Sequence, residues 1–522
     1  MQYRVPFLLL LVGPIALCTT ARDASAQADF DCVAPIAPNP ANPLVLGNGT
    51  PGSVTTAMIQ NALDAGGAIR INAGASTIAV DATLIVTRET ILDLGGATLS
   101  GGGARRVLEV RNPSNLTYTF ALQDGAVVAG STPGGSGAAL FKDTGGPWQV
   151  VTIRIFDVDF NDNHAIAVAQ DGGGGAVYVV GAAEISVVGA NFNGNSGANG
   201  GALYSLVSQR VNLHDSAFVG NVATGSGGNP GNGGNGGAVG VDGGVDNEPR
   251  FLNLCRVRLI ANQSNAFGAG IFTVTYSGNS FTRIRDSTLQ ANVSVATDKL
   301  AGGAYLQGSP IEISGSTFRD NAAAGYAGLA LFGYGGVLNG RIVNSTFVGN
   351  VARTGLGGAM SIAAADSLLL ENLTIAQNSA PCDVCFAAGI ANDSGDALTM
   401  RNVIFENNIG GNAYNPWAML HPAAQGAANL QWPEVREGSG QSETPVAPGT
   451  VFASADAAAP AANGGPTETM AISAASPAFN AGTATGAPAT DQRGFPRNGA
   501  VDIGAFEVQG DAIFDDGFDG AD

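Results

Sequence analysis

Apolar and polar positions in the middle of the chain repeat in a fixed frame, in which an apolar residue is followed three positions later by asparagine. The frame first occurs at Phe160 and Asn163 and last at Phe405 and Asn408. The apolar anchors of its nine copies are Phe160, Phe192, Phe218, Leu259, Leu289, Phe318, Phe347, Ile375 and Phe405. Successive copies lie 26 to 41 residues apart, mostly close to 29. A repeat of this length is typical of solenoid proteins.

Within each copy the apolar residues alternate with others. A further apolar residue stands five positions before every anchor, as at Ile155 and Val187, and two positions earlier seven of the nine copies are apolar again. A spacing of two places side chains on one face of a strand, whereas a helix needs spacings of three and four. The pattern therefore predicts short strands.

A second motif, Gly-Gly-Ala followed by alternating apolar residues, comes after most of the asparagines. Its clearest copies are Gly174-Gly175-Ala176, Gly200-Gly201-Ala202, Gly236-Gly237-Ala238, Gly302-Gly303-Ala304 and Gly357-Gly358-Ala359. Glycine permits a tight corner, and alanine fits where two walls approach closely. Because no copy can bury its apolar residues alone, the copies must stack. We predict an all-β fold, a right-handed parallel β-helix solenoid, since connections between parallel strands overwhelmingly take that hand.

Stacking assigns the repeated residues different places. The anchors are expected inside, where each contributes about 1.5–3 kcal/mol on burial. The asparagines are expected at corners, because asparagine tolerates left-handed backbone. Stacked in register, their amides can also form a hydrogen-bonded ladder.

The two ends of the repeat region differ from its middle. A short capping helix is expected over residues 53–65, with Ser53 as N-cap and Gly66 as the stop. The apolar face of this helix consists of Met58, Ile59, Ala62 and Leu63. We divide the chain into residues 1–26 as signal peptide, 27–67 as N-terminal cap, 68–420 as parallel β-helix, 421–462 as an Ala/Pro-rich closing segment or linker, 463–507 as an irregular C-terminal module and 508–522 as an acidic tail.

The first 26 residues have the pattern of an export signal. Arg4 precedes an apolar run from Val5 to Leu17, and Ala24-Ser25-Ala26 supplies a cleavage site of small residues. The run is too short to span a membrane, and no second stretch of the chain is long enough. We therefore expect an extracellular or cell-surface protein without a transmembrane segment after cleavage.

The net charge and the cysteines limit the expected partners and the expected disulfides. The net charge of −19 repels nucleic acid, so a nucleic-acid partner is not expected. Of the four cysteines outside the signal, Cys382 and Cys385 form a close pair. In an exported protein a local disulfide is the expected state of this pair, and a redox-active dithiol or half of a zinc site are the alternatives.

Candidate chemistry is sparse, and no set of catalytic residues is predicted. Asp157, Asp159 and Asp162 form the best acidic cluster and a weak candidate calcium site, since their spacing begins like an EF-hand loop. The alternative is that Asp157 is a corner residue, because Asp or Asn stands at the same position in most other copies. No other cofactor is expected.

Three tyrosines follow the Gly-Gly-Ala motifs. Tyr178, Tyr204 and Tyr305 either line a sugar-binding wall or pack as ordinary strand aromatics. The sequence favours packing, because aromatic residues are common in strands whatever their function.

The chain resembles exported bacterial right-handed parallel β-helix proteins of the pectin-lyase-like superfamily, with a C-terminal module similar to the "choice-of-anchor Q" type. The repeats carry the first resemblance over about residues 68–410. The second depends above all on the segments from Asp491 to Arg497 and from Asp502 to Glu507. The resemblance implies export and a surface or extracellular location. It carries over no anchoring residue.

Two functions follow as hypotheses. The first is a non-enzymatic, adhesin-like secreted or surface scaffold that binds a glycan or a surface protein along its side walls. The second is a carbohydrate-active enzyme, a polysaccharide lyase or hydrolase, which the resemblance in fold implies. Fold alone does not decide between them. The oligomeric state is not predicted.

Overall fold

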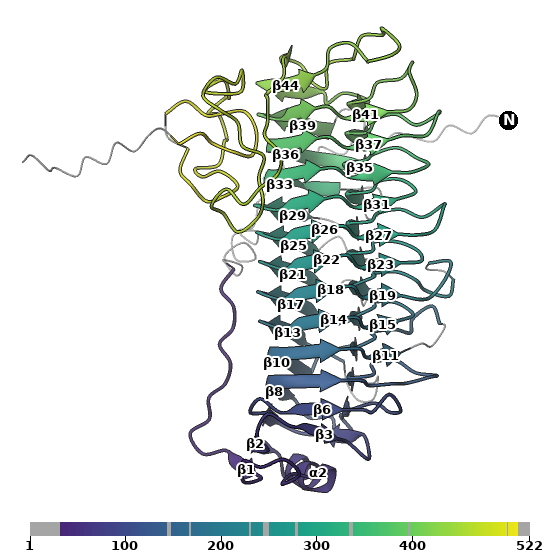
Figure 1. Ribbon diagram of the computed structural model, residues 1–522, viewed down its shortest axis with the longest axis vertical. Helices are drawn as coiled ribbons and strands as arrows, with labels where there is room; N and C mark the ends of the chain where they lie inside the picture. Colours follow the sequence, from purple (N-terminus) through teal and green to yellow (C-terminus); the bar gives the residue numbers. More distant parts are fainter. Residues whose placement is uncertain are drawn as a thin grey trace, which may run out of the picture. The chain divides into compact units, whose positions relative to one another are not determined.

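In the computed structural model, each turn of the repeat region, here called a coil, contributes strands to three parallel sheets (Figure 1). The structure describes residues 32–142, 148–165, 169–228, 231–243, 250–276, 280–308, 310–333, 338–394, 397–497 and 499–509. The expected signal peptide, and the tail apart from residues 508 and 509, lie outside these ranges. From Ala34 onward the chain forms one structural unit.

Three sheets make up the walls of the solenoid. Sheet A contains β1 (Leu44–Leu46), β2 (Gly67–Ile71), β3 (Thr77–Ala79), β5 (Thr90–Asp93), β6 (Thr98–Ser100), β8 (Tyr118–Val128), β10 (Val151–Asn161), β13 (Glu184–Val188), β14 (Asn191–Asn193), β17 (Arg210–His214), β18 (Ala217–Val219), β21 (Phe251–Cys255), β22 (Arg258–Ile260), β25 (Phe281–Arg285), β26 (Thr288–Gln290), β29 (Ile311–Ser314), β30 (Thr317–Arg319), β33 (Leu338–Val348), β36 (Ala365–Ala376), β39 (Leu398–Arg401), β40 (Ile404–Glu406), β43 (Gln425–Ala427), β44 (Asn429–Trp432) and β45 (Thr450–Phe452). Sheet C contains β11 (His164–Ala165), β15 (Ser196–Gly197), β19 (Val222–Ala223), β23 (Gln263–Ser264), β27 (Val293–Ser294), β31 (Ala322–Ala323), β34 (Val351–Ala352), β37 (Ser379–Ala380) and β41 (Ile409–Gly410). Sheet B contains β4 (Leu84–Val86), β7 (Leu108–Val110), β9 (Leu140–Lys142), β12 (Val177–Val180), β16 (Leu203–Leu206), β20 (Val239–Asp242), β24 (Ile271–Val274), β28 (Ala304–Gln307), β32 (Leu329–Phe332), β35 (Met360–Ala363), β38 (Ile390–Asn392) and β42 (Met419–Leu420).

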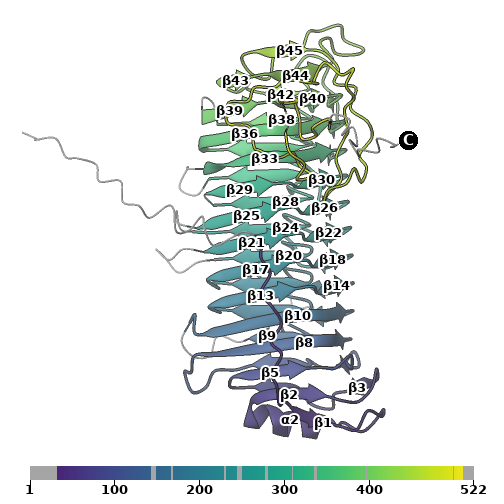
Figure 2. The same cartoon turned by 90° about the vertical axis from the view of Figure 1, so that its left-hand side faces the viewer.

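The coils wind as a right-handed parallel β-helix, which confirms the predicted fold class. The chain runs through two strands of sheet A, then sheet C, then sheet B, and returns one level higher. Figure 2, turned by 90°, shows β20, β24 and β28 of sheet B one above another. The strands extend the solenoid beyond the expected range of 68–420, because β1 pairs with β2 and β45 pairs with β44.

The nine repeat anchors stack in a single interior column. Phe160 pairs in register with Phe192, and Phe192 with Phe218. The column continues through Leu259, Leu289, Phe318, Phe347, Ile375 and Phe405. The rings of Phe192 and Phe218 are stacked with centroids 4.5 Å apart. Their burial confirms the stacking predicted from the repeat, since all nine anchors are at most 1% exposed.

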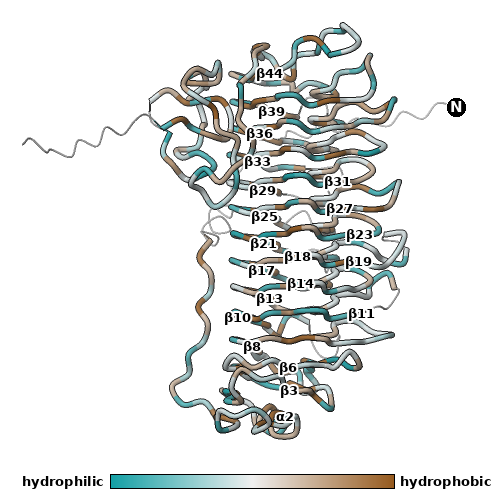
Figure 3. The backbone as a smooth tube through the Cα atoms, in the orientation of Figure 1, coloured by the Kyte–Doolittle hydropathy of each residue, from teal (hydrophilic) through white to brown (hydrophobic). Residues whose placement is uncertain are grey.

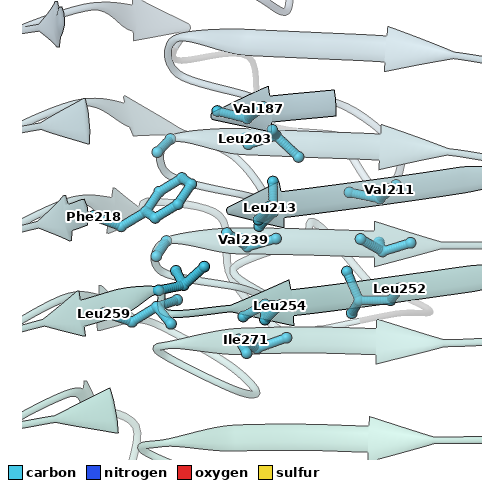
Figure 4. Close-up of a cluster of buried hydrophobic side chains, with 14 of the residues drawn as sticks. Val187, Leu203, Val211, Leu213, Phe218, Val239, Leu252, Leu254, Leu259 and Ile271 are labelled. Atoms are coloured by element: carbon cyan, nitrogen blue, oxygen red, sulfur yellow. The ribbon is translucent and has the colours of Figure 1, made fainter. Parts of the chain in front are cut away.

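The remaining core comes from the inward residues of all three walls. Figure 4 shows side chains of sheet A, such as Leu213 and Leu254, directed toward Leu203 and Val239 of sheet B. Hydropathy alternates along single strands in Figure 3, because successive side chains point to opposite faces of a sheet. One continuous apolar core therefore runs through the stacked coils.

The repeat asparagines form the predicted amide ladder. From Asn163 to Asn378, each side-chain amide donates to the side-chain oxygen of the next asparagine at 2.9 to 3.0 Å, as Asn195 does to Asn221. The same amide also donates to an anchor carbonyl, for example from Asn195 to the backbone oxygen of Phe160 at 3.0 Å. One expectation was wrong: the left-handed residue is the one before the asparagine, such as Asp162 with φ of 54°. The asparagine is needed for its hydrogen bonds, because a buried amide is costly unless it is paired.

The Gly-Gly-Ala motif forms the corner that leads into sheet B. Gly200 has a φ of 50°, and a Cβ there would lie 2.2 Å from the backbone oxygen of Leu203. The motif at Gly302 is shifted by one position relative to the other copies. Strand pairing shows this, because Tyr305 directly follows the motif and yet aligns with Phe272. Ala301 therefore occupies the left-handed corner of that coil, with φ of 64°.

The predicted capping helix is α2 (Thr56–Ala65). Its N-cap is Thr55, whose hydroxyl accepts from the backbone of Met58, and not Ser53 as expected. The hydroxyl of Ser53 instead donates to the backbone oxygen of Thr50 at 2.6 Å. Ile59 and Leu63 are fully buried and close the N-terminal end of the core, while Met58 is 37% exposed. No helix among the described residues is long and apolar enough to cross a membrane.

The C-terminal part of the chain leaves the solenoid after β45 and returns along sheet A. Residues 463–507, the C-terminal module, lack regular strands (yellow in Figure 1). Ile472 and Ile503 of the module share an apolar cluster with Ile404 on sheet A. The module is therefore packed on the solenoid wall.

Candidate functional site

The acidic cluster predicted from the sequence lies on β10 and just after it. Asp157 and Asp162 adopt left-handed backbone, with φ of 50° and 54°, so both turn the chain at the ends of a strand segment. Asp159 lies between them and accepts a hydrogen bond from the Asn191 amide at 2.8 Å. Five residues of extended strand span roughly 15 Å, too far for one cation. The described residues contain no three His, Cys, Asp or Glu side chains grouped to hold a metal ion.

Asp157 belongs instead to a column of corner residues, as the alternative interpretation proposed. The equivalent positions in the nine coils all have φ between 46° and 66°: Asp157, Gly189, Asp215, Arg256, Asp286, Gly315, Asn344, Asn372 and Asn402. Asp and Asn suit this place because their short polar side chains tolerate left-handed backbone. This set is called the corner column below.

The cysteine pair lies in the loop between β37 and β38. Cys382 and Cys385 are joined by a disulfide, with their Cα atoms 5.0 Å apart. Cys385 is buried against Ala352, Ala380 and Ala388. The bond closes a very short loop at a corner of the solenoid, where it holds the local backbone.

The second feature is the contact between the C-terminal module and sheet A. The outward residues Thr317, Thr346 and Thr374 stack in register and are at most 1% exposed under the module. Thr346 donates to the side-chain oxygen of Gln492 at 2.7 Å, and the Gln492 amide donates to Thr317 at 2.9 Å. One glutamine therefore bridges two coils.

The corner column supplies the other half of this contact. Asn344 donates its amide to the Thr490 backbone oxygen at 2.7 Å, and Asn402 to that of Thr483 at 2.9 Å. Asn372 donates to the backbone oxygens of Asp502 and Gly504 at 3.3 and 3.2 Å. Three asparagine amides thus pair with backbone carbonyls of the module.

Charged residues of the segments that carry the sequence resemblance hold the module itself together. Arg497 pairs with Glu507 at 2.6 Å, and both side chains are at most 3% exposed. Arg493 pairs with Asp491 at 2.7 Å, and the Asp491 carboxylate also accepts from the backbone of Glu507. Burial raises the pKa of Glu507 and of Asp502, and it lowers the pKa of Arg497 despite the attraction of Glu507. These residues act in folding and docking of the module.

The third feature is a column of aromatic side chains on the outer face of sheet B. Strand pairing aligns Phe141, Tyr178 and Tyr204 in successive coils, then Gly240, then Phe272 and Tyr305. All of these positions point away from the core, because they alternate with inward residues such as Val177 and Leu203. The column divides at Gly240 into two groups.

The first group, which precedes Gly240 in the column, is closely packed, and its two tyrosines are buried. Tyr178 donates to the Asp171 backbone oxygen at 2.8 Å, and Tyr204 donates to the Asp242 carboxylate at 3.3 Å. Tyr204 is fully buried, and its ring lies over Gly240, where a Cβ would come within 2.5 Å of it. Burial and the nearby Asp242 charge raise the pKa of the Tyr204 hydroxyl well above its ordinary value. For Tyr178 and Tyr204, the packing interpretation describes the structure.

The second group is larger and partly exposed. It gathers six aromatic side chains, named the aromatic patch: Phe267, Phe272, Tyr276, Tyr305, Tyr326 and Phe332. Tyr305 lies at its centre, with ring centroids 5.3 Å from Phe272, 5.2 Å from Phe267 and 5.0 Å from Phe332. Tyr326 lies 6.5 Å from Phe332. Tyr276 is 41% exposed, Phe272 is buried at 3% exposure, and the other four rings are half-buried.

One member of this patch, Tyr305, is recognisable from the sequence pattern. Phe272 stands two residues after the corner motif that ends at Gly270, as Tyr178 and Tyr204 do after theirs. The sequence pattern therefore also predicts that its side chain points outward. Phe267 and Tyr326 lie in loops before β24 and β32, and they join the patch only through the packing of neighbouring coils.

No family model matches the chain. No curated protein matches it either. Among solved structures, it is similar to tailspike protein 3 of bacteriophage CBA120, with 10% identity and a TM-score of 0.35, over 77% of this chain and 64% of that chain. It is also similar to the A-module of the mannuronan C-5 epimerase AlgE4 of Azotobacter vinelandii (14% identity, TM-score 0.26, 78% of this chain and 98% of that chain) and to PfbA, a surface adhesin of Streptococcus pneumoniae (11%, 0.32, 78% and 99%). The chain thus spans about two thirds of the tailspike's length, and these likenesses concern the fold alone.

Proposed function

We propose that this protein is an extracellular or cell-surface β-helix scaffold that binds a glycan on the outer face of sheet B, without cleaving it. The aromatic patch is the observation that carries the proposal. Soluble proteins normally bury large aromatic side chains, whereas five of the six rings in the patch are at least partly exposed. Exposed apolar clusters mark interaction sites.

The chemistry of the patch fits a sugar better than a purely apolar ligand. Aromatic rings offer flat apolar faces, which suit the C–H faces of pyranose rings, and tyrosine adds a polar hydroxyl. The Tyr305 hydroxyl is protonated at neutral pH, as in any tyrosine, and can donate a hydrogen bond; burial raises its pKa further. The patch therefore combines aromatic rings with hydroxyl groups.

The rigid support of the patch also favours binding. Phe272, Tyr305 and Phe332 project from strands β24, β28 and β32, whose backbones are paired coil to coil. Side chains fixed on strands lose little conformational entropy when a ligand binds. A solenoid wall of this kind presents a preformed platform.

Binding is tested with the protein from residue 27 to 522 on a glycan array, followed by affinity electrophoresis in soluble polysaccharides. The double variant Tyr305→Leu and Phe332→Leu keeps apolar volume but removes two rings. We expect it to bind roughly tenfold more weakly or worse, equivalent to about 1.4 kcal/mol. Tyr414→Ala removes an 81% exposed tyrosine outside the patch and is the matched control.

Equal binding by the double variant and the parent would refute the patch as the site. Release of shorter sugars from any bound polysaccharide would instead favour the enzymatic hypothesis.

A further inference from the structure

We infer that the open half of the outer face of sheet A binds a second copy of this chain, in an antiparallel dimer with two-fold symmetry. The open half is the outward surface of β10, β14, β18, β22 and β26 with the corners before them, which the C-terminal module leaves at least partly exposed. Figure 1 shows β14, β18, β22 and β26 one above another. The inference concerns a different wall from the aromatic patch and does not depend on glycan binding.

The N-terminal end of the open half is acidic. Asp157 stands at the corner within β10, Asp159 lies two residues further along, and Asp162 directly follows the strand. All three residues are exposed, and none forms an ion pair with another described residue. Arg154 on the same strand lies 3.9 Å from Glu184 instead. The negative charge of this end is therefore not compensated by a neighbouring cation.

The other end of the open half carries arginines. Arg258 of β22 is exposed and forms no ion pair with another described residue. Arg256 pairs with Asp215 and Arg285 with Asp286, but the two arginine side chains remain 37% and 46% exposed. Three arginines against two aspartates leave a surplus of positive charge, in a chain whose net charge is −19.

Uncharged residues separate the two ends. Ala217 and Val219 of β18 pair with Asn191 and Asn193 of β14, and Ile260 of β22 pairs with Val219. Val219 is 36% exposed, and Ala217 and Ile260 are half-buried. Exposed apolar groups rimmed by polar residues are typical of interaction surfaces. The open half therefore has an acidic end, an aliphatic middle and a basic end.

The register of the strands makes this pattern self-complementary. Asp159, Asn191, Ala217 and Arg258 occupy one column on successive coils. We consider a two-fold axis between two facing copies, parallel to the strands and level with the gap between β14 and β18. It leaves each column opposite itself and reverses the order of the coils. Asp159 of each copy then faces Arg258 of the other, so the pair occurs twice.

The corner column gives the same match. Asp157 and Arg256 occupy this column at the levels of Asp159 and Arg258, so they also face each other across the axis. A two-fold axis parallel to the solenoid would instead place every residue opposite its own copy. Aspartates would then face aspartates and arginines would face arginines, and like charges oppose such contact. The charges therefore favour the antiparallel arrangement.

The size of the open half predicts a weak dimer. Its five coils span about 24 Å along the solenoid, and its strand segments span about 15 Å. Two such faces bury on the order of 1,000 Å² of accessible surface, which is typical of weak and transient interfaces. The net charge of −19 on each chain also opposes association at long range. We therefore expect a reversible dimer that forms at roughly 10–100 µM protein.

Sedimentation equilibrium of the chain from residue 27 to 522, at about 1–200 µM, tests the dimer. Asp159→Arg and Arg258→Asp each place like charges opposite one another at both meeting points. Each variant alone should weaken the dimer at least about tenfold. Asp159→Arg lowers the net negative charge, so weaker long-range repulsion would strengthen association and cannot explain a loss.

An equimolar mixture of the two variants tests the two-fold symmetry. In a mixed dimer, one meeting point brings together the two introduced residues, which have opposite charges, and the other keeps the original Asp159 and Arg258. The mixture should therefore associate within about threefold of the parent, although each variant alone does not. Contact between two copies with their coils in reverse order gives this result.

Asp64→Arg, at an exposed position of the capping helix α2, is the matched control for charge and should leave the dimer unchanged. A parent protein that stays monomeric at about 200 µM would overturn the inference. A mixture that associates no better than the single variants would also overturn it. Equal association of the parent and both single variants would show that this face is not the interface.

Discussion

The outer face of sheet A consists of two halves built on the same backbone. In the covered half, Thr317, Thr346 and Thr374 lie under the C-terminal module and are at most 1% exposed. In the open half, the same column continues through Asp159, Asn191, Ala217, Arg258 and Thr288, which are exposed or half-buried. The two halves therefore have the same coil geometry and differ in their outward side chains.

The corner column shows the difference most clearly. Asp157 and Asp215 of the open half have φ of 50°, and Asn344 and Asn372 of the covered half have 46° and 52°. Aspartate and asparagine both tolerate this left-handed backbone conformation. Only the amide can donate to a carbonyl, and in the covered half all three asparagines do so to the module. The residue at each corner is therefore matched to what packs against it.

The largest effect is expected from breaking the buried ion pair of the module. Arg497→Met leaves Glu507 buried without its cation, which costs about 3–5 kcal/mol. Thermal unfolding should show a lower transition temperature, and hydrogen exchange should increase first in residues 463–507. Arg256→Met is the control in the open half: its pair with Asp215 is 37% and 40% exposed, so the loss should stay below about 1 kcal/mol. Equal losses in the two variants would contradict a module held by this pair.

A smaller effect is expected from exchanging the corner residues of the two halves. Asn372→Asp places a carboxylate against the backbone oxygens of Asp502 and Gly504 and removes the donor, at a cost of about 1–3 kcal/mol. Protease sensitivity of residues 463–507 should increase. Asp157→Asn is the reciprocal change at an exposed corner and should alter stability by less than about 0.5 kcal/mol. A module that stays protected in Asn372→Asp would show that the amide is not required.

The smallest effect is expected in the threonine column. Thr346→Val removes the hydrogen bond to Gln492, which should lower the free energy of unfolding by about 1 kcal/mol in chemical denaturation. Thr288→Val, at the same column position in the open half, should change it by a few tenths, about the size of ordinary surface substitutions. If both valine variants were equally stable, the bridge from Gln492 would contribute nothing.

The sequence by itself determined the solenoid. Spacing of two within strands, a repeat near 29 residues and an asparagine three positions after each anchor are local features, and stacking them in register buries Phe192 on Phe218 without further information. The amide ladder follows for the same reason, because identical residues one coil apart must meet. The start of the helix was not determined by the sequence: the N-cap is Thr55 instead of Ser53, and both residue types are favoured at an N-cap.

Only the tertiary structure decided what lies on the walls. Asp157 and Asn372 hold equivalent places in the repeat, yet the partner of Asn372 comes from residues about 130 positions later in the chain. Likewise, Tyr204 and Tyr305 follow similar motifs, but the Tyr204 ring is buried over Gly240, whereas Tyr305 contacts one ring from a loop and two from neighbouring strands. A repeat specifies which side chains stack because that depends on neighbouring coils. Which of the outward side chains become covered depends on chain segments outside the repeat, and no local pattern records it.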